Sequence, residues 1–355
     1  MTPAIEDTVS LFSDTETRPT PGMRAAMAAA EVGDEQKGED PTIIRLQERV
    51  AHLLGKEAAL WLPTGTMCNL VAVKTHTRPG DALVAEAMAH VIRAESGGAA
   101  LASGVMVQPI PTARGIFTAA ELEAAFDRVG AVPVPYGQPV GLVCVEQTHN
   151  FGGGAVWRAE ELGAVSACAR QRGVPVHMDG ARLLNASVAS DVPAATFATE
   201  VDSVWIDFTK GLGAPIGAVL AGTRDFVSVA RRYKQLFGGA MRQAGIAAAG
   251  CLYALDHHVE RLAEDHEHAR LLARGLAGID GIALRTAEPE TNMIFFDVGG
   301  LGLSNREFVD RLAASGVRVS GAGGAIRAVT HLDVSRQGVE RAISAIGEIA
   351  SEPRG

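Results

Sequence analysis

Helical patterns alternate with short apolar runs from residue 42 to residue 221 of the chain. In the helical stretches apolar residues recur at steps of three and four, whereas the apolar runs end at Gly, Pro or Asp. This alternation is typical of a mostly parallel sheet covered by helices, so we predict an α/β fold with a seven-stranded sheet. The predicted strands are residues 58–62, 82–85, 105–109, 140–146, 174–178, 204–208 and 217–221. The clearest helices are residues 43–54, 119–126 and 160–172, with helix starts at Thr118 and Thr66 and a helix end at Gly173.

The pattern changes after Ala244. One helical pattern continues from there to Ala269, and strands near 293–298 and 328–333 then mix with helices near 305–315 and 339–350. This mixture predicts a smaller α+β domain packed against the first one. We expect a large domain with an amino-terminal arm over residues 1–250 and a small carboxy-terminal domain over residues 251–355.

Composition and charge narrow the classes of function. The chain has 355 residues and a formal net charge of −9, with no cluster of basic and aromatic residues, which argues against a nucleic-acid partner. No apolar stretch is long enough to span a bilayer, and the amino terminus lacks the charged and apolar regions of a secretory signal, so we expect a cytoplasmic protein with no membrane partner. The four cysteines are widely spaced and predict neither a disulfide framework nor a zinc cage.

Lys210 is the first candidate for chemistry. It follows the predicted strand 204–208, and glycines just after it permit a sharp turn. Lysine is scarce, because the chain has five lysines and its other basic side chains are arginines or histidines. An amine loses its proton when partly desolvated and condenses with a carbonyl to give a Schiff base, which a guanidinium cannot do. The sequence therefore offers Lys210 as a nucleophile, the alternative being a strand-end lysine that points to water.

Other chemical groups follow the predicted strands, where ligands of open parallel sheets bind. Gly65 and Thr66 open a helix whose free NH groups suit a phosphate, although an ordinary turn and cap has the same pattern. Asp179 can pair with a pyridine nitrogen or cap a helix, and His90 can stack on a flat ring or end a helix. Together with Lys210, these groups are what pyridoxal 5′-phosphate (PLP) requires.

Eight short motifs are spread over nearly the whole chain. They are Ser13-Asp-Thr-Glu-Thr-Arg-Pro-Thr20, Val32-Gly-Asp34 followed by Gly38-Glu-Asp-Pro41, Thr64-Gly-Thr66, Glu146-Gln-Thr-His-Asn150, His177-Met-Asp-Gly-Ala-Arg182, Thr209-Lys-Gly-Leu-Gly-Ala-Pro215, Gly238-Gly-Ala-Met-Arg-Gln-Ala-Gly245 and Val329-Thr-His-Leu-Asp333. Together they resemble the L-threonine aldolase family of the low-specificity type, PLP-dependent enzymes of the aspartate aminotransferase fold (fold type I). The resemblance implies a carbon–carbon lyase that reversibly cleaves L-threonine, L-allo-threonine and related β-hydroxy-α-amino acids to glycine and an aldehyde.

The resemblance also implies roles in holding the cofactor. Lys210 would form the Schiff base with PLP, Asp179 would pair with the ring nitrogen, and His90 would stack on the ring. Gly65 and Thr66 would bind the phosphate.

Arginines would complete the site by the same resemblance. Arg242 would reach the phosphate from a neighbouring subunit, in a homotetramer built as a dimer of dimers. Ser13, Arg182 and Arg327 would bind the amino-acid carboxylate, because an arginine can grip a planar anion with two hydrogen bonds, and Arg182 would also contact the cofactor. His149 would lie near the β-hydroxyl of the substrate. It is our first choice of catalytic base, directly or through a water, with His90 the second.

Two positions depart from the family pattern. Lys37 stands where the family often has a tyrosine, and Ala94, just before Glu95, stands where it often has an aromatic residue. Both positions would be near the substrate's β-substituent or a subunit contact, so the side-chain preference stays open.

Three other functions remain open from the residues. One fold hosts many PLP reactions, so the protein could be another PLP-dependent β-eliminating lyase or an aminotransferase. A metal-dependent hydrolase would use His149, His177, Asp179 and His331, although His-x-Asp is a poor metal signature, and the favoured reading needs no metal. A non-catalytic protein that keeps the fold is the third.

Overall fold

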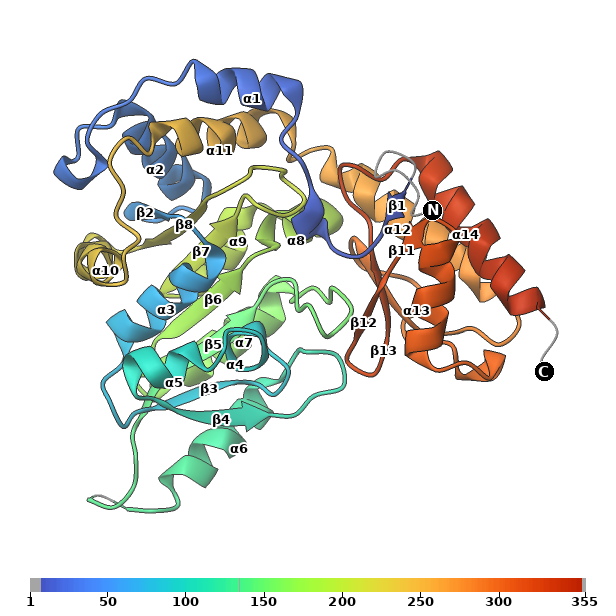
Figure 1. Ribbon diagram of the computed structural model, residues 1–355. Coiled ribbons are helices and arrows are strands. Elements are labelled where there is room, and N and C mark those ends of the chain that lie inside the picture. The colour runs from blue at the N-terminus through green and yellow to red at the C-terminus, as the bar shows by residue number, and fades with distance from the viewer. Residues whose placement is uncertain (1–7, 134, 353–355) are drawn as a thin grey trace.

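The computed structural model describes residues 8–133 and 135–352. Its largest sheet has seven strands in the order β2-β8-β7-β6-β5-β3-β4 (Figure 1). All of them run parallel except β8, which is antiparallel to both of its neighbours. The strands are β2 (Ala58–Leu62), β3 (Ala82–Glu86), β4 (Met106–Ile110), β5 (Val140–Glu146), β6 (Val176–Gly180), β7 (Ser203–Asp207) and β8 (Ala218–Gly222). The predicted α/β fold with a mostly parallel seven-stranded sheet is confirmed.

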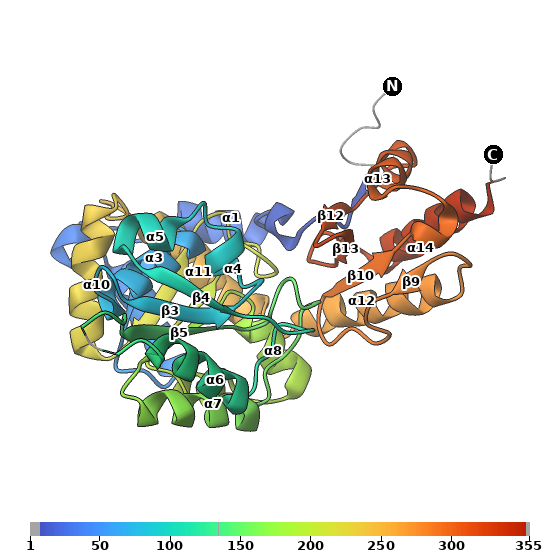
Figure 2. The ribbon, with the colours of Figure 1, turned by 90° about the horizontal axis from the view of Figure 1, so that it is seen from below.

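Alternation of side chains along each strand gives the sheet two buried faces. On β5, Val143 and Val145 join the larger core, whereas Leu142 and Cys144 face the opposite layer. Figure 2 shows α3 and α5 on one side of the sheet and α6 and α7 on the other. The helices of this part of the chain are α1 (Pro21–Ala28), α2 (Pro41–Leu53), α3 (Gly65–His76), α4 (His90–Arg93), α5 (Gly98–Ser103), α6 (Ala119–Gly130), α7 (Ala159–Gln171), α8 (Leu183–Ser190), α9 (Ala194–Thr199), α10 (Arg224–Leu236) and α11 (Gly245–His257).

Helix ends follow the local sequence. Thr118 caps α6 with a reciprocal bond pattern to Glu121, as predicted, and Gly173 follows α7 at φ +68°. Gly65 and Thr66 open α3 as predicted, but the cap is Thr64, which accepts a hydrogen bond from the NH of Met67. Strand β6 begins two residues later than predicted, since Pro175 has no NH to donate to the sheet. Asp179 therefore lies within β6.

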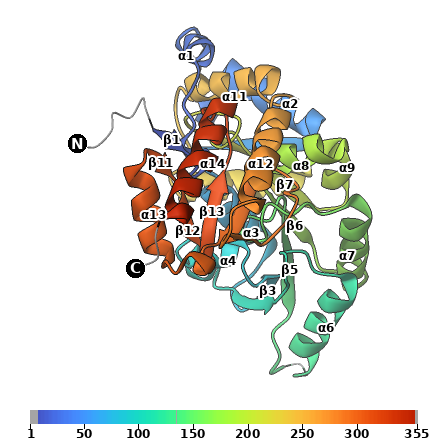
Figure 3. The same cartoon turned by 90° about the vertical axis from the view of Figure 1, so that its right-hand side faces the viewer.

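A smaller sheet forms a second layer with the last helices (Figure 3). Its antiparallel order is β12-β13-β10-β9, and a separate parallel pair joins β1 to β11. The strands are β1 (Val9–Ser10), β9 (Ala283–Leu284), β10 (Met293–Asp297), β11 (Val317–Arg318), β12 (Ser320–Ala322) and β13 (Ala325–Val329), and the helices are α12 (Leu262–Ala277), α13 (Asn305–Ala314) and α14 (Arg336–Ser351). The described residues also include the short 3₁₀ helices η2 (Asp14–Glu16), η3 (Glu35–Lys37) and η4 (Gly299–Leu301).

Two predictions for this part of the chain are wrong. The expected helix from Ala244 to Ala269 is two helices, because the chain turns after α11, where the His258 ring bonds the carbonyl of Leu212 at 2.7 Å. The expected strand 328–333 keeps only its first two residues in β13. Beyond them, the Thr330 NH still bonds the carbonyl of Asn292, whereas its hydroxyl turns to the carbonyl of Asp265 and the strand ends.

The amino-terminal segment belongs to both parts of the molecule. Leu11 is fully buried in the core of the smaller layer, whereas Met23 is buried in the core of the large one. The short chain between them crosses the boundary. Residues 1–7, where the signal sequence would begin, lie outside the described residues. None of the helices in the described ranges has both the length and the hydropathy to cross a membrane.

Leu11→Ala is expected to lower the free energy of unfolding by about 2–4 kcal/mol, because truncating a fully buried leucine leaves a cavity. Leu101→Ala is the matched control. Leu101 is 89% exposed on α5, so we expect a change within about 0.5 kcal/mol there. Urea unfolding measures both variants, and an effect at Leu11 as small as that at Leu101 would contradict the assignment of Leu11 to the smaller core.

Candidate active site

A cavity of about 410 Å³ opens at the carboxyl ends of β5, β6 and β7. In-register pairing of Glu146 with Asp179, and of Asp179 with Trp205, sets these strand ends side by side. Eight of the ten site residues predicted from the sequence line the cavity, namely Ser13, Gly65, Thr66, His90, Asp179, Arg182, Lys210 and Arg327. His149 and Arg242 do not line it.

Lys210 presents its amine to this cavity. Its Nζ lies 2.8 Å from Oδ2 of Asp207, whose carboxylate is almost fully buried and also lines the cavity. The backbone carbonyl of Lys210 accepts a hydrogen bond from the Thr17 hydroxyl at 2.7 Å, so the amino-terminal segment fixes the lysine loop. The carboxylate and the carbonyl contact thus fix the position of the Lys210 amine at the cavity wall.

Asp179 is the most deeply placed carboxylate of the cavity. One of its oxygens accepts from the amide of Asn69 at 2.8 Å and the other from the backbone NH of Ala181 at 3.1 Å. Burial raises the pKa of Asp179 to about 6, and the neighbouring Glu146 adds to the rise. A cationic partner beside Asp179 would stabilise the charged carboxylate and lower its pKa, so the carboxylate suits a protonated ring nitrogen.

His90 opens α4 beside Asp179. The backbone NH of His90 donates a hydrogen bond to Glu146 at 2.7 Å, and its ring Nδ1 lies 2.9 Å from Oε1 of Glu95. The hydrogen bond to Glu95 raises the pKa of His90, although burial opposes it. The ring is therefore fixed at the cavity wall, as stacking on a flat ligand requires.

The amino terminus of α3 forms another wall. In its first turn the NH groups of Gly65 and Thr66 have no intrahelical acceptor, and both residues line the cavity. A Cβ at Gly65 would lie 2.3 Å from the ring of Trp205, so glycine is required at this position. Free NH groups at the start of a twelve-residue helix suit an anion such as a phosphate.

Arg182 is already paired in this structure. Its Nε and Nη2 each donate to the carboxylate of Asp14 at 2.7 Å, and the amide of Asn292 donates to the same carboxylate at 3.2 Å. The two-bond grip that we expected on a substrate carboxylate is thus made to Asp14, which leaves Nη1 as the nitrogen for a ligand. Arg327 is held by Asn150 at 2.9 Å and by the carbonyl of Phe12 at 3.3 Å.

His149, which we expected beside the substrate hydroxyl, does not line the cavity. Its side chain is 1% exposed, Nδ1 accepts from the NH of Gly152, and Nε2 lies 3.0 Å from Glu86 and 3.9 Å from Glu146. Burial alone would lower the pKa of His149, but Glu146 and Glu86 raise it. The ring is buried beside two carboxylates, and of the three groups Glu146 reaches the cavity.

Three other predicted positions have clear places. Arg242 is largely exposed and pairs with Asp34 at 3.0 Å. Ala94 lines the cavity, whereas Lys37 is exposed on η3.

Sequence reasoning missed five polar residues of the site, which are Asp14, Asn69, Glu95, Glu146 and Asp207. Asp14 and Glu146 lay inside motifs already singled out, Glu95 stands next to Ala94, and Asp207 stands three residues before Lys210, whereas Asn69 lay in none of the motifs. The signal that could have found them is a polar side chain in an otherwise apolar strand or helix face, which is costly to bury without a partner.

The metal-hydrolase alternative finds no support in the described ranges. His177 contacts Ser203 and Asn69, and His331 contacts the carbonyl of Ser10, so neither meets His149. Across residues 8–133 and 135–352, the one group of His, Cys, Asp and Glu with ligand atoms close enough for a metal is His90, Glu95 and Asp179. This group shares only Asp179 with the four residues of the predicted metal site.

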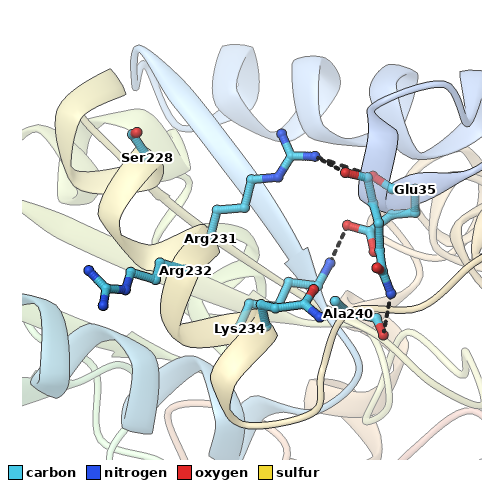
Figure 4. A pocket seen from close by; sticks show the side chains of 8 residues that line it. Glu35, Ser228, Arg231, Arg232, Lys234 and Ala240 are labelled. Atoms are coloured by element: carbon cyan, nitrogen blue, oxygen red, sulfur yellow. Dashed lines mark hydrogen bonds and ion pairs between the residues drawn. The ribbon is translucent and has the colours of Figure 1, made fainter.

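A second cavity, of about 220 Å³, contains another buried lysine (Figure 4). There the Nζ of Lys234 lies 2.5 Å from Glu35 and 5.0 Å from the ring centroid of Trp61. Burial lowers the pKa of Lys234. Its wall has arginines at positions 231 and 232 but no histidine and no second carboxylate, so it lacks the groups that accompany Lys210.

The first cavity fits PLP by its donor set. It has an amine for the aldehyde, a buried carboxylate for the ring nitrogen, a histidine for the ring face and a helix start for the phosphate. Oε2 of Glu95 is buried without a hydrogen-bond partner among the described residues, and such an atom points to a missing donor at this wall.

Comparison with known proteins agrees with this geometry. The family model described as beta-eliminating lyase matches residues 10–298. The chain is 38% identical to low-specificity L-threonine aldolase 1 of Arabidopsis thaliana, over 95% of this chain and 94% of that protein. It is 39% identical to the low specificity L-threonine aldolase of Escherichia coli K12, over 93% of this chain and 95% of that protein.

A solved structure shares the fold. The threonine aldolase of Leishmania major matches with a TM-score of 0.82 at 22% identity, covering 96% of this chain and 99% of that one. The matched family model, the relatives over nearly their full length and the shared fold lead to one conclusion: the chain belongs to the beta-eliminating lyase family and, within it, to the low-specificity L-threonine aldolases.

Proposed function

We propose that the protein is a PLP-dependent carbon–carbon lyase that cleaves L-threonine, L-allo-threonine and related β-hydroxy-α-amino acids to glycine and an aldehyde, reversibly. The observation that carries the proposal is that the amine of Lys210 and the buried carboxylate of Asp179 line one cavity, with the first turn of α3 as a further wall. The names of the aligned relatives supply the substrate class.

PLP would be held by Lys210 at its aldehyde, Asp179 at its ring nitrogen, His90 at its ring face, and Gly65 with Thr66 at its phosphate. When bound, it supplies an electron-accepting ring beside the substrate's reacting carbon. Asp207 would orient the amine of Lys210 towards the aldehyde, since the two groups lie 2.8 Å apart.

The amino acid would bind through its α-carboxylate. Nη1 of Arg182 contacts it while Asp14 holds the rest of the guanidinium, and Ser13 and Arg327 complete the contact from the amino-terminal segment and β13. Three fixed contacts orient the bond to be broken relative to the ring.

The proton of the substrate hydroxyl has two destinations at the cavity wall. Glu146 lies there with the ring of His149 behind it, so His149 acts through Glu146 or a water rather than by contact. His90, our second choice from the sequence, lines the cavity itself but shares its Nδ1 with Glu95. Both routes keep the proton inside the protein while the aldehyde leaves.

We further propose a cytoplasmic homotetramer, a dimer of dimers, in which Arg242 of one subunit reaches the phosphate of the next. The exposure of Arg242 outside its own cavity supports this arrangement. Measuring glycine and aldehyde against keto-acid formation separates aldol cleavage from the aminotransferase alternative.

Lys210→Ala is expected to slow aldehyde release from L-threonine by on the order of 10³-fold or more, because the cavity loses its nucleophile. A coupled assay that reduces the aldehyde measures it. Lys56→Ala is the control, since Lys56 bonds the carbonyl of Val201 outside the cavity and its loss should leave kcat unchanged. Normal turnover by Lys210→Ala would refute the proposal.

Asp14→Asn is expected to raise KM for L-threonine by roughly tenfold with a smaller change in kcat, because Arg182 loses its charged partner. Arg182 holds the pKa of Asp14 well below its usual range, although burial opposes it. The ion pair therefore stabilises the fold fully above about pH 4 and is lost as pH falls further. Steady-state kinetics at pH 7 measures KM for L-threonine, and an unchanged KM would contradict the prediction for Asp14→Asn.

His149→Gln is expected to remove a pH-dependent part of the stability. The folded pKa of His149 is raised, so its contribution is fully present below about pH 6.5 and declines as pH rises through the folded value. Thermal unfolding from pH 6 to pH 9 should show that the difference in melting temperature between wild type and variant becomes smaller as pH rises. A gap that widens would mean that His149 is neutral in the folded protein.

A further inference from the structure

Asn69 lies behind Asp179 with all four of its hydrogen-bonding capacities used. Its Nδ2 donates to Glu95 at 2.6 Å and to Asp179 at 2.8 Å. Its Oδ1 accepts from the indole NH of Trp205 at 2.7 Å and faces Nε2 of His177 at 3.2 Å. The amide is thus held in one orientation, with both hydrogens on carboxylates.

A buried chain of side chains reinforces that orientation. Nδ1 of His177 lies 2.8 Å from the Ser203 hydroxyl, and Nε2 of His76 lies 2.7 Å from the same hydroxyl. Burial lowers the pKa of His177 to about 3 and that of His76 to about 4, so both rings are neutral near pH 7. His177 then accepts from Ser203 and donates to Asn69, which excludes a flipped amide.

The two carboxylates bound by Asn69 form a pair at one wall of the cavity. The ligand atoms of Asp179, Glu95 and His90 lie within 4.8 Å of one another. Oε1 of Glu95 accepts from both His90 and Asn69, whereas its buried Oε2 has no partner in the part of the chain that the structure describes. Two like charges this close repel, and a donor that carries positive charge would stabilise both.

We propose that Asn69 is a positioning residue that holds Asp179 and Glu95 together as a paired acceptor for the protonated ring nitrogen of PLP. This inference rests on the proposed function and adds a second carboxylate to the ring-nitrogen site. Asp179 and Glu95 come from different elements, and Asn69 is the residue that bonds both. Without its amide the carboxylates would separate, and the ring nitrogen would lose part of its charge-assisted contact.

The test compares two cofactors by equilibrium binding to the apoprotein. One is PLP, and the other is the analogue in which carbon replaces the ring nitrogen while the aldehyde and phosphate remain. Asn69→Ala should weaken PLP binding by about tenfold or more, which is the scale of a hydrogen bond to a charged group, and analogue binding by less than about twofold. Trp205→Phe keeps the Asn69 amide but removes the indole NH that bonds it. This variant should also weaken PLP binding more than analogue binding, by a smaller factor than Asn69→Ala does.

Two control variants separate this effect from general damage. Thr66→Ala removes a hydroxyl at the phosphate wall and should weaken both cofactors equally. Asn185→Ala removes another buried asparagine, which bonds His266, and should lower the apoprotein melting temperature without changing either dissociation constant.

The outcomes are distinct. Loss of affinity confined to PLP supports the inference, and equal loss of both cofactors, or loss of neither, in Asn69→Ala overturns it while leaving the proposed function in place. A wild-type protein that binds no PLP overturns the proposed function and the inference with it.

Discussion

The parallel register of β5, β6 and β7 is the constraint on which the site depends. Backbone pairing places Glu146 opposite Asp179, and Asp207 ends the next strand, so three carboxylates from distant parts of the chain meet at one edge of the sheet. Lys210 follows directly and is drawn to the nearest of them, Asp207. A cavity at this edge is expected for an open parallel sheet, and the charges around it are set by strand register before any ligand binds.

Burying so many charges requires partners, and these partners shape the rest of the site. Asp14 neutralises Arg182 and, through Asn292, ties both parts of the molecule to the cavity. His149 stands between Glu86 and Glu146, beneath the wall rather than in it. An unpaired charge in such a place would cost several kcal/mol, so these groups are as necessary to the cavity as the residues that line it.

Local pattern predicted what depends on local physics. Strands 58–62 and 140–146 have the bounds of β2 and β5, because short, mostly apolar runs with flanking turn residues mark them. The break between α11 and α12 could not be predicted, since it depends on His258 meeting the carbonyl of Leu212. Lys210 and Asp179 could be found from spacing and family resemblance, whereas Asp14 and Asn69 act through partners more than a hundred residues away. The burial of His149 could not be predicted from local pattern either, because it depends on contact with Glu86 at the end of another strand, β3.

The central claim is that one particular amine, that of Lys210, bonds the aldehyde of PLP. Borohydride reduction of the PLP-loaded protein followed by peptide mapping tests it most directly, because reduction makes that bond permanent. The geometry predicts a pyridoxyl group on Lys210 and none on Lys234, the other buried lysine that faces a cavity. A label on Lys234, or on no lysine, would contradict the claim.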